Sequence, residues 1–111
     1  MKKPTRWYSD KQEKQVAKAT GGKQTPNSGS TPYVKGDVLT DQFLIECKTV
    51  TRKQKQFTIY KEWIIKNREE AFAMRKDYSA VAFDFGDAER FYIIDEKLFK
   101  QLILHLKEEN K

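Results

Sequence analysis

The chain has 111 residues, with 22 Lys and Arg against 16 Asp and Glu, a formal net charge of +6, and one cysteine. This length suits a single domain with a modest core. The lone cysteine excludes an internal disulfide and suits a reducing compartment, and no apolar run has the length of a membrane span or the place of a signal peptide. The basic excess favours a polyanionic partner, without separating DNA from RNA.

The N-terminal part of the chain predicts an arm, a helix and a turn-rich loop. Residues 1–9 show no clear periodicity and are interpreted as an N-terminal arm. Asp10 can cap a helix over residues 11–20, and Gly21-Gly22 would stop it. A polar loop rich in Gly, Ser and Pro follows over residues 23–32. We expect this loop to lie beside the next strand, where its backbone amides could approach a phosphate.

The rest of the chain alternates strand and helix patterns. Thr58 and Asp95 are the expected helix caps, and Leu98, Leu102 and Leu106 mark one face of the last helix. The predicted elements are strands over 33–39 and 43–50, a basic connection over 51–56, a helix over 58–76, strands over 79–85 and 90–94, and a final helix. This order predicts an α/β domain with a mixed sheet covered by helices.

Three charged residues of the predicted hairpin carry the strongest chemical signal. Asp37 ends the first strand, and an apolar run over residues 43–45 leads to Glu46 and Lys48. Since side chains alternate along a strand, Glu46 and Lys48 point to one face while Ile45 and Cys47 point to the other. The hairpin therefore predicts two carboxylates and one amine close together on one face of the sheet.

Such a cluster suits metal-dependent hydrolysis of a phosphodiester bond. Carboxylate and carbonyl oxygens are the ligands that Mg²⁺ prefers, and Mn²⁺ would substitute for it. Asp37 and Glu46 would hold the metal, the backbone carbonyl of Cys47 would add a third oxygen, and Lys48 would sit near the attacking water. The same residues also fit an exposed cross-strand salt bridge without chemistry. Glu-x-Lys alone decides nothing, because residues 109–111 repeat it in the charged tail.

The segments Gly29-Ser30, Gly36-Asp37 and residues 45–49 (Ile-Glu-Cys-Lys-Thr) resemble the PD-(D/E)xK nuclease superfamily. Within it, residues 10–95 look most like the small Holliday junction resolvases of archaea and bacterial viruses, and residues 57–63 and 78–86 look like the viral branch. The resemblance implies a restriction-endonuclease-like fold, with a mixed central sheet flanked by helices, as one domain over residues 1–111. Gly36 departs from the pattern, whose name has proline at that place.

The resemblance also implies roles for individual residues. Asp37 and Glu46 match the metal ligands, Lys48 matches the catalytic lysine, and Glu13 matches a helix glutamate that completes the acidic cluster. Without the resemblance, Glu13 is interpreted as a solvated charge paired with a nearby lysine. Ser28 or Ser30 matches a loop serine near the scissile phosphate. The basic residues proposed to contact phosphate are Lys23, Lys35, Arg52, Lys53 and Lys55.

Other residues are given structural roles. Cys47 is interpreted as a small core residue with its thiol directed away from the site. The single histidine, His105, has no Cys or His partner, which argues against zinc. Trp63, Phe72 and Met74 are assigned to the core or a dimer interface rather than to base stacking.

The leading hypothesis is a Mg²⁺-dependent endonuclease, a phage-type Holliday junction resolvase that nicks four-way DNA junctions as a homodimer. No small-molecule cofactor and no membrane partner are expected, and the expected place of action is the cytoplasm, of the host cell if the protein is viral. One alternative keeps the chemistry and changes the substrate, to a nicking, repair or restriction-type endonuclease. Another is a non-catalytic nucleic-acid-binding module whose acids only balance charge.

Overall fold

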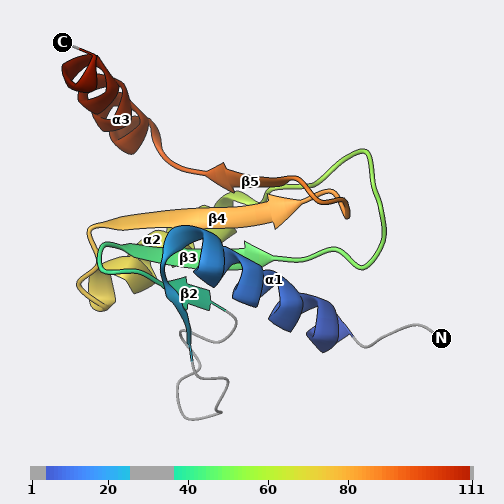
Figure 1. The fold of residues 1–111 in the computed structure, drawn as a ribbon. Helices are drawn as coiled ribbons and strands as arrows, with labels where there is room; N and C mark the ends of the chain where they lie inside the picture. The colour runs from blue at the N-terminus through green and yellow to red at the C-terminus, as the bar shows by residue number, and fades with distance from the viewer. Residues whose placement is uncertain (1–4, 26–36, 111) are drawn as a thin grey trace.

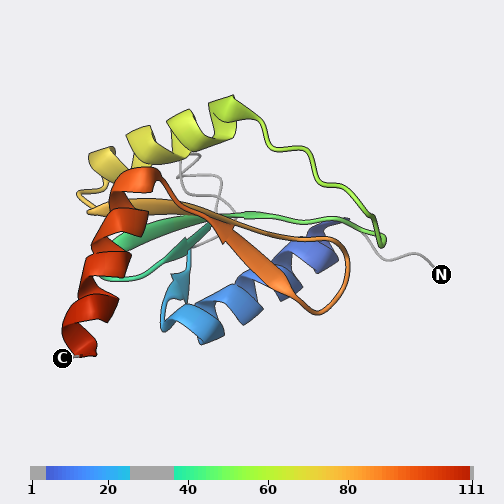
Figure 2. The same ribbon diagram turned by 90° about the horizontal axis from the view of Figure 1, so that it is seen from above.

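The computed structural model describes residues 5–25 and 37–110. This part of the chain forms a five-stranded mixed sheet in the order β1-β2-β3-β4-β5, in which β3 and β4 are parallel and the other neighbours antiparallel. Helices α1 and α2 cover opposite faces of the sheet (Figure 1, Figure 2). The elements are α1 (Thr5–Thr20), β1 (Lys23–Gln24), β2 (Asp37–Leu39), β3 (Phe43–Lys48), α2 (Lys61–Ala73), β4 (Tyr78–Asp84), β5 (Arg90–Ile93) and α3 (Glu96–Glu109). The predicted α/β architecture with a mixed sheet is confirmed.

Each face of the sheet has its own apolar layer. On the face covered by α1, Val16 packs on the central strands, and this core cluster consists of Val16, Val38, Ile45, Ala80 and Ala82. Residues of the opposite parity, Leu44 and Val81, are also buried, at 0% and 2% exposure, on the face covered by α2. The central strands β3 and β4 are therefore buried on both faces, as expected for parallel neighbours.

The N-terminal prediction was wrong in two respects. Helix α1 begins at Thr5, so residues 5–9 are helical rather than part of an arm. Asp10 lies inside the helix, where its carboxylate pairs with Lys14 at 3.0 Å instead of capping an end. The physical reason is that no Gly or Pro interrupts residues 5–20, so the helix extends back through Trp7 and Tyr8.

The predicted hairpin is confirmed over its described part, β2 and β3, although β3 ends at Lys48 rather than at residue 50. Residues 26–36, which include the start of the predicted first strand, lie outside the described residues. The loop predicted from residue 23 was wrong at its start, because Lys23 and Gln24 form the edge strand β1 against β2. Lys23 and Gln24 satisfy their backbone hydrogen-bonding groups by pairing with β2, and no local sequence signal predicts this pairing.

The second helix was predicted too long. It begins at Lys61, with Tyr60 as its N-cap residue and no side-chain capping bond, so Thr58 is not the cap. The residues just before it have no regular secondary structure, and the Phe57 ring packs on Phe83 with the two centroids 4.8 Å apart, away from a helical path. The helix ends before Arg75, whose φ of 58° is left-handed and incompatible with a continuing helix.

The third helix agrees with its predicted cap. The Asp95 carboxylate accepts a hydrogen bond from the Leu98 amide at 2.9 Å, as an N-cap residue does. Of the predicted leucine face, only Leu98 is buried, whereas Leu102 and Leu106 are 44% and 60% exposed. Phe72 was assigned to a core or dimer interface; at 85% exposure it is outside the core of this chain.

Gly86 joins the turn after β4 to the basic segment that follows β3. Its φ of +88° suits glycine, and a Cβ there would lie 2.6 Å from the backbone oxygen of Arg52. Two residues on, the Gln54 amide donates to the Phe85 carbonyl at 2.8 Å. This close backbone approach holds the segment that carries Arg52 and Lys53 against the sheet.

We expect Gly86→Ala to lower the free energy of unfolding by about 2–4 kcal/mol, from left-handed backbone strain and a clash with the Arg52 carbonyl. Gly21→Ala is the matched control, because φ is +73° and no heavy atom lies within 4 Å of an added Cβ. It should cost only about 1 kcal/mol. Urea unfolding measures both, and equal losses would contradict the role given to the close approach.

Candidate active site

The β2–β3 pairing brings the two predicted metal ligands together. Asp37 lies directly opposite Glu46 in the antiparallel ladder, and directly opposed residues have their Cβ atoms about 4.5–5.5 Å apart on the same face. Thr25 fixes the backbone of Asp37 from the neighbouring edge, since its amide donates to the Asp37 carbonyl at 2.9 Å and its hydroxyl lies 3.2 Å from the same oxygen. The backbone of Asp37 is therefore held from both sides, by Thr25 and by β3.

Lys48 completes the predicted trio on the same face. Its ammonium nitrogen is 3.4 Å from Glu46 Oε1. The ammonium also lies over the Trp63 ring, 4.2 Å from the ring centroid, in a cation–π contact. Trp63 comes from the first turn of α2 and is half-buried. Its ring limits where the Lys48 side chain can point.

Asp37 is held in conditions that disfavour a second negative charge. Asp37 is buried, with only 4% of its surface exposed. Burial is the largest cause that raises the pKa of Asp37, from 3.8 to about 8. The carboxylates of Glu46, Glu70 and Glu13 raise this pKa further, in decreasing order of effect. The Lys48 ammonium lowers it. A cation placed between the carboxylates would reverse this effect and favour the ionised form of Asp37.

The donors of the site fit a magnesium ion with most of its water shell. Glu46 Oε2 is buried and has no hydrogen-bond partner in the structure. A buried carboxylate oxygen normally binds a cation or a hydrogen-bond donor, and this one has neither. In the described residues, no three His, Cys, Asp or Glu side chains converge as a complete metal cage. Mg²⁺ commonly binds through one or two carboxylates and keeps several waters, so Asp37 and Glu46 suffice as its side-chain ligands.

Cys47 has the predicted orientation. Its side chain packs against the core cluster on the α1 face, opposite Glu46 and Lys48. Burial, followed by the Glu13 carboxylate, raises the pKa of the Cys47 thiol, so the neutral thiol is favoured. The backbone carbonyl is therefore the only group of Cys47 that suits a hard cation.

Two further glutamates approach the pair from opposite layers. Glu13 belongs to α1, is 6% exposed, and has an oxygen 3.4 Å from the Gln24 amide nitrogen. This burial argues against the solvated surface charge considered above. Glu70 belongs to α2, on the face of Glu46, and raises the pKa of Asp37 more than Glu13 does. Burial raises the pKa of Glu70 as well, and Glu46 adds to the effect.

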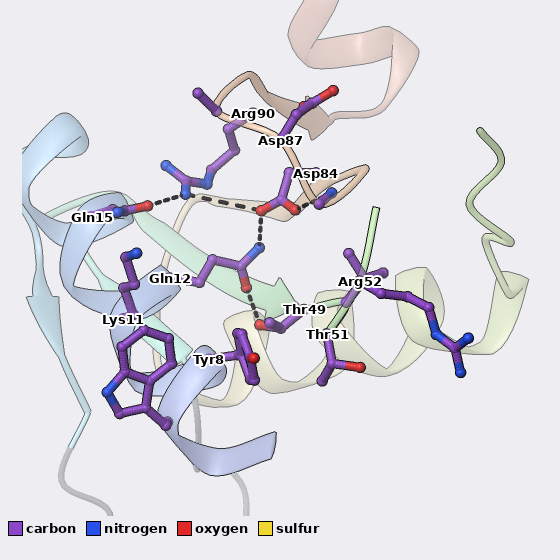
Figure 3. Close-up of a pocket in the computed structure, with 14 residues that line it drawn as sticks. Tyr8, Lys11, Gln12, Gln15, Thr49, Thr51, Arg52, Asp84, Asp87 and Arg90 are labelled. Atoms are coloured by element: carbon purple, nitrogen blue, oxygen red, sulfur yellow. Dashed lines mark hydrogen bonds and ion pairs between the residues drawn. The ribbon is translucent and has the colours of Figure 1, made fainter. Parts of the chain in front are cut away.

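A buried glutamine holds the chain directly after Lys48. Gln12, 3% exposed, donates from Nε2 to the Lys48 carbonyl at 2.8 Å and to Asp84 Oδ2 at 3.2 Å. Its Oε1 accepts a hydrogen bond from the Thr49 hydroxyl at 2.5 Å. Figure 3 shows Gln12 between Thr49 and Asp84, in a hollow of about 390 Å³ on the α1 side. This clamp fixes the end of β3 and so the position of Lys48.

The predicted phosphate-contacting residues are placed unequally. Arg52, Lys53 and Lys55 are exposed and follow the end of β3 that carries Lys48. Lys23 pairs with Leu39, at the end of β2 away from Asp37, so it does not join them. Lys35, Ser28 and Ser30 lie outside the described residues, and their predicted roles stay predictions.

No protein-family model, curated protein or solved structure matches this chain in the comparisons made. In the residues that the structure describes, no helix is both long and apolar enough to cross a lipid bilayer. Function therefore has to be inferred from the geometry and chemistry of the site.

The residues that the sequence did not single out reach the site by tertiary packing. Gln12 and Glu70 lie on different helices, 34 and 24 positions from Glu46 in the sequence. No sequence motif marks Gln12. A glutamine on a basic helix is usually exposed, so the sequence alone gives no reason to place Gln12 in the site. Glu70 could have been found only from its place beside Ala71, which faces the sheet at 3% exposure.

We expect Asp37→Asn to remove a pH-dependent loss of stability. Since the folded pKa of Asp37 is about 8 and the reference value is 3.8, the protonated form stabilises the metal-free fold below pH about 4. This contribution is lost as pH rises through about 8. The melting temperature of wild type should therefore fall relative to Asp37→Asn between about pH 5 and pH 9, by several degrees.

Millimolar Mg²⁺ should raise the melting temperature of wild type at high pH and leave Asp37→Asn unchanged, because the neutral amide is a poor ligand. Differential scanning calorimetry with and without EDTA measures both effects. Parallel pH profiles for the two proteins would contradict the raised pKa.

Proposed function

We propose that this protein is a Mg²⁺-dependent DNA endonuclease with a restriction-endonuclease-like fold. The observation that carries the proposal is the Asp37–Glu46 pair, directly opposed on β2 and β3, with the Lys48 ammonium 3.4 Å from Glu46. The orphaned Glu46 Oε2 supports a cation at this place. The Lys48–Glu46 salt bridge occupies Glu46 Oε1 only, and it would not explain a second, buried carboxylate directly opposite Glu46.

In this proposal the side chains divide the work of hydrolysis. Asp37 and Glu46 hold the metal, which when bound lowers the pKa of a water and neutralises a non-bridging phosphate oxygen. Lys48 holds the water by its ammonium group and balances the charge that develops on the phosphoryl oxygens. The water oxygen attacks phosphorus and gives up a proton to solvent, the bond to the 3′ oxygen breaks, and the leaving oxygen takes up a proton from solvent. The products are a 3′ hydroxyl and a 5′ phosphate.

The substrate we propose is branched DNA, a four-way junction in particular. The basic segment over residues 52–55 follows the catalytic strand directly, and its lysine and arginine side chains are exposed. Such side chains contact phosphates and so read the path of the backbone rather than the base sequence. Little sequence preference is therefore expected, and two copies of the site would suit two strands of a symmetric junction.

Cleavage should depend on the trio and on the metal. We expect Asp37→Asn, Glu46→Gln and Lys48→Ala each to lower the rate of junction cleavage by about 10²–10³-fold or more. EDTA should abolish cleavage, while junction binding survives in all three variants. Glu109→Gln is the matched control, since residues 109–111 repeat Glu-x-Lys outside the site.

The assay compares labelled four-way junctions, linear duplex and flap DNA, with binding followed separately by fluorescence anisotropy. Symmetric nicks near the crossover support the resolvase, whereas preferential cutting of linear duplex assigns another endonuclease role. Junction binding without cleavage, indifferent to Mg²⁺ and unchanged in Glu46→Gln, would instead identify a binding module.

Glu70 and Glu13 are the two candidates for a third carboxylate beside Asp37 and Glu46, and a matched pair of variants distinguishes them. Because Glu70 shares the layer of Glu46 and affects Asp37 more strongly than Glu13 does, we expect Glu70→Gln to raise the Mg²⁺ concentration for half-maximal cleavage more than Glu13→Gln. Magnesium titrations of the cleavage rate measure this difference. A larger effect of Glu13→Gln would assign the role to the α1 glutamate that the sequence predicts.

A further inference from the structure

Helix α3 carries an apolar face that nothing in the described chain covers. Four side chains on it are between 39% and 60% exposed: Phe99, Leu102, Ile103 and Leu106. Leu98 is the only buried residue of this helix. In both ribbon views α3 stands at one end of the molecule, beyond β5 (Figure 1, Figure 2), so its face is open to a partner.

These four side chains form one stripe. With about 100° of rotation per residue, they fall within about 100° of the helix surface. Leu98 borders the stripe and anchors the first turn to the body. Leu104 lies on the opposite side of the helix. A stripe of this width is typical of a helix that packs against another element.

Two charged residues beside the stripe, Glu96 and Lys107, are complementary between two copies, whereas Lys100, about 20° farther round the helix, would face the Lys100 of the other copy. Glu96 and Lys107 lie on the same edge, within about 20° of each other around the helix. The midpoint between them falls at residues 101–102, which is also the middle of the stripe. Suppose that two α3 helices pack antiparallel about a two-fold axis at that midpoint. The same edge of each helix then lies beside that of the other copy, with the order of residues reversed, so each Lys107 faces the other copy's Glu96.

We propose that this face of α3 pairs with the same face of a second copy of the chain, antiparallel and about a two-fold axis near residues 101–102. Two Lys107–Glu96 contacts flank the shared apolar seam, and the helix dipoles oppose favourably. Parallel packing would leave both copies of Glu96 without a lysine opposite. This interface rests on α3 alone and does not require the proposed nuclease activity.

The first experiment measures mass by sedimentation equilibrium from low to high micromolar concentration. Wild type should dimerise, and Leu106→Glu should weaken the dimer at least tenfold. Leu104→Glu is the matched control, since both leucines are 60% exposed but Leu104 lies outside the stripe. It should dimerise like wild type. Circular dichroism melts check that the monomers remain folded, as expected for exposed positions.

A charge swap tests the orientation. Glu96→Lys and Lys107→Glu should each weaken the dimer, because each places like charges together twice, and the double variant should restore it. A wild type that is monomeric throughout would overturn the proposal, and another molecule would then have to cover the stripe. A dimer sensitive to Leu104→Glu, or a double variant that is not restored, would overturn the antiparallel seam.

Discussion

The register of β2 against β3 is the constraint on which both the core and the site depend. Val38 and Ile45 oppose each other and are buried under α1, and this places Asp37 opposite Glu46 on the other face. A slip of one residue in β2 would turn Asp37 into the apolar layer and Val38 out of it. The hydrophobic energy that locks the core therefore also fixes the distance between the carboxylates.

This arrangement places the site in conflict with the stability of the metal-free fold. A buried Asp37 beside other carboxylates resists ionisation, and the orphaned oxygen of Glu46 lacks the partner that buried polar atoms normally find. Lys48 relieves only part of this charge. Such strain is common where a protein keeps groups ready for a ligand instead of for its own packing.

The two helical layers support the site in different ways. From one side, α2 brings Trp63 over the Lys48 ammonium and Glu70 near the acids. From the other side, α1 brings Gln12 to the backbone after Lys48. The ring contact limits where the Lys48 side chain can point, and the glutamine fixes the backbone that carries it.

Local signals in the sequence were enough for the strand pattern, the Asp95 cap and the shared face of Glu46 and Lys48. These features depend on side-chain alternation and on hydrogen bonds between near neighbours, which a sequence displays directly. The early start of α1 follows from the absence of Gly and Pro over residues 5–20. The edge strand β1 and the late start of α2 were missed because non-local pairing and ring packing set them. The inclusion of Gln12, Glu70 and Trp63 in the site likewise needed the folded chain. Residues far apart in sequence become neighbours only when burial of the two apolar layers fixes how helices lie on the sheet.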